Sequence, residues 1–78
     1  MRRGIVSKIV NSFGASWGRI RPEGESREVF FNASTLLNAS EFPTIAVGQP
    51  VEFDEEPDRA NGSHAVRVSL IAAEAGIG

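Results

Sequence analysis

A chain of 78 residues forms one small domain, and the absence of cysteine excludes disulfide bonds and thiolate metal sites. No apolar run reaches the ~18 residues of a membrane-spanning helix. The basic start Met1-Arg2-Arg3-Gly4 is followed by a stretch too short and too polar for a signal peptide. We therefore expect a cytoplasmic domain with no membrane partner.

The net charge of −2 is unevenly distributed along the chain. Residues 1–34 hold six basic and three acidic side chains, whereas residues 35–78 hold two basic and seven acidic ones. The overall charge argues against a general polyanion binder. A local basic patch can nevertheless bind phosphate groups while the rest of the surface is acidic.

Three short strands are expected in the first half of the chain, at Gly4–Val10, Trp17–Arg21 and Glu28–Ala33. The turn Asn11–Ser16 separates the first two, and its Gly14 is free to adopt a positive φ. Pro22 ends the second strand because it cannot donate to a β-ladder. The charged turn Glu23–Ser26 then predicts a hairpin.

The second half is expected to contain one helical turn and two strands, at Ser34–Leu37, Val51–Glu55 and His64–Ile71. Ser34 is the predicted N-cap of the helical turn, and Pro43 is expected to bar a helix from the connection that follows. Asn61-Gly62 is a strong hairpin signal between the last two strands. Val66, Val68 and Leu70 are expected to share one face of the last strand.

Five short strands without a long helix predict an all-β fold, a small five-stranded antiparallel barrel. Closure into a barrel removes exposed sheet edges, and an OB-fold or an SH3-like barrel would fit this strand count. We expect residues 1–71 to form the domain and residues 72–78 to be a flexible C-terminal tail.

The second and third predicted strands suggest a binding face. Side chains alternate along a strand, so Trp17, Arg19 and Arg21 share one face. Phe30 and Asn32 can join them if the strands pair, which leaves the residues Ile20, Val29 and Phe31 for the core. Aromatic rings interleaved with cations suit single-stranded nucleic acid, since rings stack on bases and cations meet phosphates. Alternatively, the two aromatic residues belong to the core and the two arginines pair with Glu23 or Glu28.

Four further residues are candidates for the same face. Lys8 and Arg59 either contact phosphate or belong to the plain surface. His64 has no cysteine near it and is expected at the edge of the binding face, not in a metal site. Phe42 either clamps a base or folds back over the end of the barrel.

No catalytic site is expected. The acidic run at residues 52–56 alternates with the strand, which favours a solvated edge over a metal or acid–base site. Neither a nucleophile with its base nor a glycine-rich phosphate loop is present. The sequence therefore predicts no enzyme activity, no metal and no cofactor.

The chain from about Gly4 to Ile71 resembles a cold-shock domain in five consecutive segments, which are Gly4-Ile5-Val6, Trp17–Pro22, Arg27–Ser34, Phe42–Phe53 and Ala65–Ile71. The second is similar to the Gly-Phe-Gly-Phe-Ile motif, the third to the Asp-Val-Phe-Val-His motif, and the fourth to the aromatic loop with its Gly-Gln-x-Val-x-Phe strand. The resemblance implies an OB-fold that binds single-stranded RNA or DNA with low sequence specificity. It also implies a role as an RNA chaperone or a modulator of transcription or translation.

The departures from the family pattern concern the stacking residues. Lys8-Ile9 stands where the family has Trp-Phe, Arg19 replaces the second ring of the first motif, and Asn32 replaces the histidine of the second. Arg19 can partly replace the missing ring, because a guanidinium also stacks on bases. The alternative interpretation is a protein-interaction module or homodimer on the same barrel, with an eroded nucleic-acid face.

Overall fold

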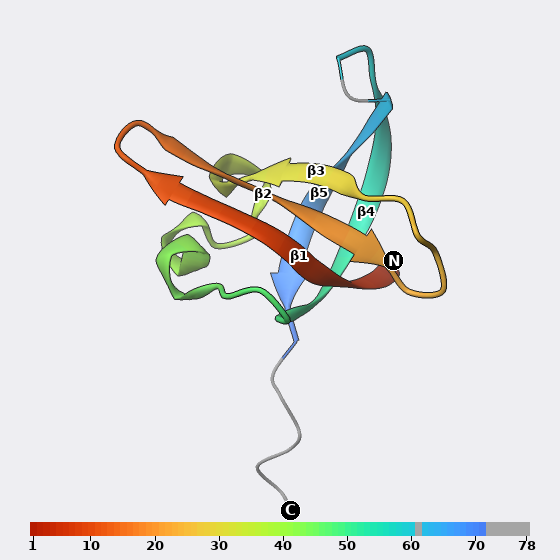
Figure 1. Ribbon diagram of the computed structural model, residues 1–78, viewed down its shortest axis with the longest axis horizontal. Helices are drawn as coiled ribbons and strands as arrows, with labels where there is room; N and C mark the ends of the chain where they lie inside the picture. The colour runs from red at the N-terminus through yellow and green to blue at the C-terminus, as the bar shows by residue number, and fades with distance from the viewer. Residues whose placement is uncertain (61, 72–78) are drawn as a thin grey trace, which may run out of the picture.

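The computed structural model describes residues 1–60 and 62–71 (Figure 1). It contains five strands and two short 3₁₀-helices, which are β1 (Arg2–Ser12), β2 (Ala15–Pro22), β3 (Val29–Asn32), η1 (Ala33–Thr35), η2 (Ala39–Thr44), β4 (Pro50–Asp58) and β5 (Gly62–Leu70). Two predictions fall outside these residues, the Asn61 half of the last turn and the flexible tail at residues 72–78.

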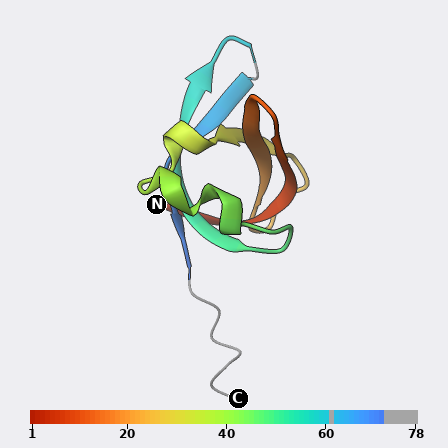
Figure 2. The same cartoon turned by 90° about the vertical axis from the view of Figure 1, so that its left-hand side faces the viewer.

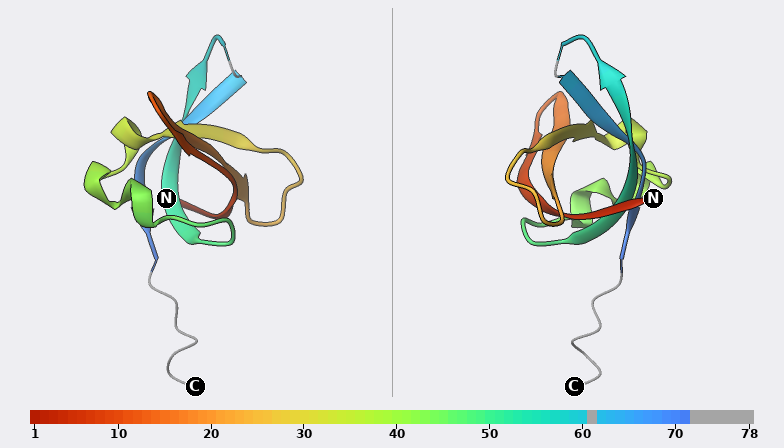
Figure 3. Two further views of the ribbon diagram at one scale, coloured as in Figure 1. Left: turned by 60° about the vertical axis from the view of Figure 1, so that its left-hand side comes forward. Right: turned by 90° about the vertical axis from the view of Figure 1, so that its right-hand side faces the viewer.

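The strands close into a barrel in the order β1-β2-β3-β5-β4, which confirms the predicted five-stranded all-β fold. Figure 2 shows the closed ring of strands, and both views of Figure 3 show the β4–β5 hairpin projecting beyond it. All neighbours are antiparallel except β3 and β5, which meet in parallel at Phe30 and His64. No helix in the described part of the chain is long and apolar enough to span a membrane.

The core lies inside this ring and contains the three residues predicted for it. Ile20, Val29 and Phe31 are fully buried together with Val6, Val51, Phe53 and Ala65. Gly18 allows β1 to approach β2 closely over Phe31. A Cβ at Gly18 would lie 2.4 Å from the Lys8 carbonyl oxygen and 2.8 Å from Phe31 Cε1, so no larger residue fits without a backbone shift.

Two β-bulges interrupt the alternation that the sequence predicts. Ser7 is the extra residue of β1 between the pairs Val6–Ile20 and Lys8–Arg19. In β5 the irregularity lies beside Arg67, whose φ of 51° is in the left-handed region. Because of this second bulge, Val66 pairs with Asp54 on the outside while Val68 is buried. The prediction that Val66 shares a face with Val68 is therefore wrong.

The connection between β3 and β4 also differs from the prediction. The N-cap of η1 is Asn32, not Ser34, and η2 includes Pro43. The expectation that Pro43 bars a helix is wrong for a 3₁₀ segment. Proline has a φ close to the helical value and removes only one N–H donor, which a helix of six residues tolerates.

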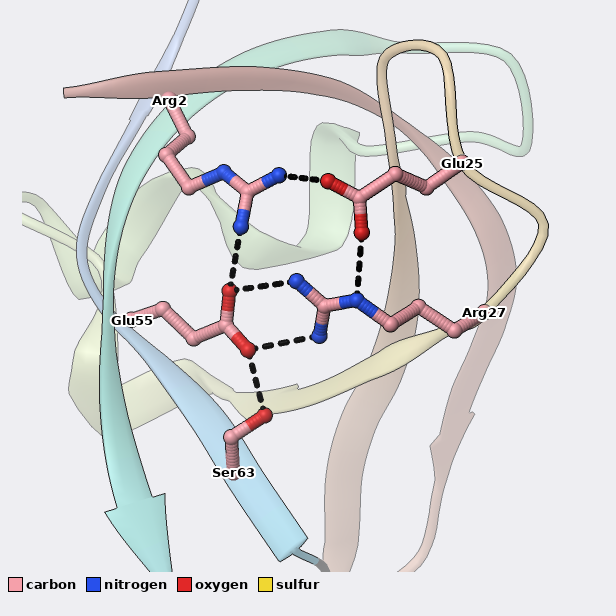
Figure 4. A network of polar contacts seen from close by, with 5 residues as sticks. All are labelled: Arg2, Glu25, Arg27, Glu55 and Ser63. Atoms are coloured by element: carbon pink, nitrogen blue, oxygen red, sulfur yellow. Dashed lines mark hydrogen bonds and ion pairs between the residues drawn. The ribbon is translucent and has the colours of Figure 1, made fainter.

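A network of ion pairs and hydrogen bonds joins four segments at one end of the barrel (Figure 4). Arg2 of β1 contacts Glu25 in the β2–β3 loop and Glu55 of β4. Arg27, from the same loop, donates to both of these carboxylates. The Ser63 hydroxyl of β5 donates to Glu55 at 2.6 Å. The network thus fastens the β2–β3 loop to the barrel.

Candidate functional site

The pairing of β1, β2 and β3 brings five of the predicted site residues onto one outer face. Lys8 pairs with Arg19 across β1 and β2, and across β2 and β3 Arg19 pairs with Phe30 and Trp17 with Asn32. Directly opposed residues in an antiparallel pair point to the same side of the sheet. We call these five residues the platform: Lys8, Trp17, Arg19, Phe30 and Asn32.

The aromatic rings of the platform stack on each other. The ring centroids of Trp17 and Phe30 are 5.7 Å apart and their planes are inclined by 24°. Both side chains are half-buried, while the inward positions of the same strands are filled by the core. The alternative that these two aromatics belong to the core does not describe the structure. Part of each ring remains available to a flat ligand.

Two cations approach the indole of Trp17. Lys8 Nζ lies 5.5 Å from the ring centroid, and Arg19 Cζ lies 5.8 Å from it. Both distances are within the ~6 Å range of a cation–π interaction. Positive charge is therefore held beside the rings.

Glu28 occupies one edge of the platform and partly neutralises it. Arg19 Nη1 lies 3.7 Å from Glu28 Oε1, and the hydroxyl of Ser7 donates to Glu28 Oε2 at 2.8 Å. The predicted alternative of an Arg19 ion pair is thus present together with the ring contact. Since both partners are exposed, this ion pair contributes little to stability, and a phosphate can compete for the guanidinium.

The two ends of the Asn32 side-chain amide differ in their hydrogen bonding. Its Oδ1 accepts hydrogen bonds from the backbone N–H and the hydroxyl of Ser34, at 3.0 Å and 2.6 Å, and so caps η1. Its amide NH₂ makes no hydrogen bond to another described residue. Asn32 can therefore donate a hydrogen bond to a ligand, while its oxygen is already used.

Phe42 is not part of the platform. It belongs to η2, is 2% exposed, and packs against Phe31 with ring centroids 6.0 Å apart. The burial of Phe42 corrects the expectation that it clamps a base. The other expectation, that it folds back over the end of the barrel, describes what is observed.

The remaining predicted residues lie around the platform. His64 is adjacent to Phe30 through the β3–β5 bridge, is half-buried, and has its Nδ1 3.2 Å from Asp58 Oδ2. Arg21 is exposed opposite Ile5 and lines a pocket of about 790 Å³. Arg59 is exposed at the turn of the β4–β5 hairpin, which Figure 1 shows well separated from the β1–β2 tip.

Charge compared between the two halves of the chain does not show how uneven it is at the β1–β2 hairpin. Residues 1–22 contain five basic side chains and no acidic one, whereas residues 23–78 contain three basic and ten acidic ones. Arg2 and Arg3 are paired with glutamates. Of the other cations on this hairpin, Lys8 and Arg21 have no ion pair among the described residues, and Arg19 is shared with Glu28 at 3.7 Å. Counting the charged residues of each predicted hairpin separately would have shown that the β1–β2 hairpin is basic.

The described residues contain no group of three side chains that could hold a metal ion.

The family model of the "'Cold-shock' DNA-binding domain" matches residues 3–71. A comparison with curated protein sequences found no match. The family match spans all five strands and agrees with the resemblance expected from the sequence.

Proposed function

The chain belongs to the cold-shock DNA-binding domain family, a non-enzymatic family that binds nucleic acid, and we propose that it binds single-stranded RNA or DNA by base stacking. The observation that supports this mode best is the stacked pair of Trp17 and Phe30 with Lys8 and Arg19 beside it. Single strands expose the faces of their bases, and each stacked base contributes ~1–3 kcal/mol.

We assign the polar residues of the platform to the sugar–phosphate backbone and to base edges. Lys8 and Arg19 contact phosphates, with Arg19 exchanging Glu28 for the ligand. The free NH₂ of Asn32 donates to a base or sugar oxygen. Arg21, His64 and Arg59 contact the strand where it leaves the platform.

Low sequence selectivity is expected of such a site, because every base has a π-face. We propose that the domain acts in the cytoplasm as an RNA chaperone or as a modulator of transcription or translation. These roles need weak, sequence-tolerant contact with exposed single strands and no catalytic group.

Titration of Trp17 fluorescence with a single-stranded oligonucleotide tests the proposal, because Trp17 is the only tryptophan of the chain. We expect quenching that weakens as salt rises, since phosphate contacts release counterions. Phe30→Ala should weaken binding by roughly 5- to 150-fold, the equivalent of ~1–3 kcal/mol.

The matched control is Leu37→Ala, which removes an exposed apolar side chain from the segment between η1 and η2 and should leave binding unchanged. Absence of quenching at ~100 μM protein in low salt, with the fold intact, would exclude single-strand binding on this face. If a protein quenches Trp17 instead, with an affinity that does not change with salt, the domain is a protein-interaction module.

A further inference from the structure

Phe13 stands at the tip of the β1–β2 hairpin and is 108% exposed, the most exposed large apolar side chain described. Ser12 and Ala15 form the last pair of the hairpin, so Phe13 and Gly14 make the turn. Gly14 has a φ of 79°, which suits a two-residue turn. The backbone thus holds Phe13 out of the core at a defined position.

The tip continues the hairpin that bears the platform. Trp17 pairs with Val10, and Phe13 follows Val10 by three residues, just beyond the end of β1. At ~3.4 Å per residue the tip lies roughly 10 Å beyond Trp17. Figure 1 shows the tip projecting past the barrel, in line with the strands that carry the platform.

The surroundings of Phe13 favour a nucleic-acid ligand over a protein one. The hairpin has no carboxylate between Met1 and Pro22, so a phosphate backbone that continues along it meets no repulsion from its own residues. The six residues from Asn11 to Ser16 are uncharged. A single exposed apolar residue is ordinary on a protein surface, but this one stands at the end of the hairpin that carries Trp17, Lys8 and Arg19.

We propose that Phe13 is a second stacking site, which binds a base of the same strand after it has left Trp17 and Phe30. The inference rests on the proposed function and deepens it. The platform alone suffices for a short oligonucleotide, whereas a longer one also reaches the tip. Phe13 therefore sets the length of single strand that the domain occupies.

Affinity as a function of oligonucleotide length tests the proposal. With ~12 nucleotides we expect Phe13→Ser to bind about tenfold more weakly than the unmodified protein, and with ~4 nucleotides equally well. Leu37→Ser is the matched control and should have no effect at either length. If Phe13→Ser binds both lengths like the unmodified protein, Phe13 is not a stacking site.

A second measurement moves the fluorescent probe to the tip. The double variant Phe13→Trp, Trp17→Phe has its only indole at position 13 and keeps an aromatic ring at position 17. We expect the long oligonucleotide to quench this indole and the short one to leave it unchanged. Unchanged fluorescence with both lengths overturns the role of Phe13 if Trp17 in the unmodified protein is quenched. If Trp17 is not quenched either, the proposed function itself fails.

Discussion

The phenylalanines of this chain show how the backbone assigns one residue type to different tasks. Phe31 and Phe53 are fully buried, Phe30 is half-buried beside Trp17, and Phe13 is fully exposed. Phe30 and Phe31 are neighbours in sequence, and only the alternation of β3 sends one ring to the platform and the other to the core. Position in the strand thus decides function here more than side-chain chemistry does.

Phe42 should contribute to stability and not to binding. We expect Phe42→Leu to lower the free energy of unfolding by about 1–2 kcal/mol, less than the ~3–5 kcal/mol of a Phe→Ala truncation, because the larger ring fills the core against Phe31. Urea unfolding measures this change. The same substitution at the exposed position, Phe13→Leu, is the control and should leave stability unchanged.

Oligonucleotide affinity of the folded Phe42→Leu protein should equal that of the unmodified one. If Phe42→Leu lowers the affinity for the oligonucleotide without lowering stability, Phe42 belongs to the binding site and the prediction is wrong.

For single residues, the sequence predicts which side chains point inward or outward within a strand, because side chains alternate there. It does not predict the orientation of side chains outside the strands. The inward positions of Ile20, Val29 and Phe31 follow from period two, as does the outward position of Trp17. Phe42 lies in the 3₁₀-helix η2, whose six residues make only about two turns, too few for a hydrophobic period to show which side faces the barrel. Its burial depends on the space over the barrel end, which only the closed fold defines.

Among the elements, strand number was predictable and strand detail was not. Turn residues mark all five strands, yet β1 extends to both sides of its expected range and contains a bulge at Ser7. A bulge arises from the pairing of two strands, so neither strand alone predicts it. This bulge changes which side chains of β1 reach the platform, and it places Lys8 opposite Arg19.

The network around Glu55 holds the β2–β3 loop against the barrel and makes the stability of the fold depend on pH. Hydrogen bonds from Arg27, and then from Ser63, lower the pKa of Glu55 from 4.5 to about 2. A carboxyl group with a lower pKa in the folded state stabilises the fold above its unfolded pKa. That contribution is lost as pH falls through the folded value.

We therefore expect Arg27→Gln to destabilise the protein at neutral pH, and the difference from the unmodified protein to shrink as pH falls from about 4.5 to about 2. Urea midpoints across this range measure it. Arg59→Gln removes the same charge from the exposed β4–β5 turn and should change stability little at any pH. Arg27 also lowers the pKa of Glu25, so a constant difference between Arg27→Gln and the unmodified protein at every pH would show that neither Glu55 nor Glu25 is responsible.

The molecule as a whole is acidic, with a net charge of −2, yet Lys8, Trp17 and Arg19 of the platform belong to the β1–β2 hairpin, which has no carboxylate between Met1 and Pro22. The acidic residues are concentrated from Glu23 onwards, and several of them pair with Arg2, Arg3, Arg27 and Arg67. A polyanion is therefore expected to approach the β1–β2 hairpin in preference to the acidic remainder of the chain. The net charge of the whole chain therefore gives no indication of the basic β1–β2 hairpin, whereas the charge of each element does.

The number of phosphate contacts follows from this distribution and can be read from the salt dependence of binding. Each contact with a single strand contributes about −0.7 to the slope of log affinity against log salt, so the four cations Lys8, Arg19, Arg21 and Arg59 together predict a slope of about −3. Lys8→Gln should make the slope shallower by ~0.7. Arg67→Gln should not change it, because Arg67 lies on β5 and is bound to Asp54 and Glu56. Equal changes in both variants would mean that the strand responds to the net charge of the molecule. A change in Lys8→Gln alone would place the phosphates along the β1–β2 hairpin.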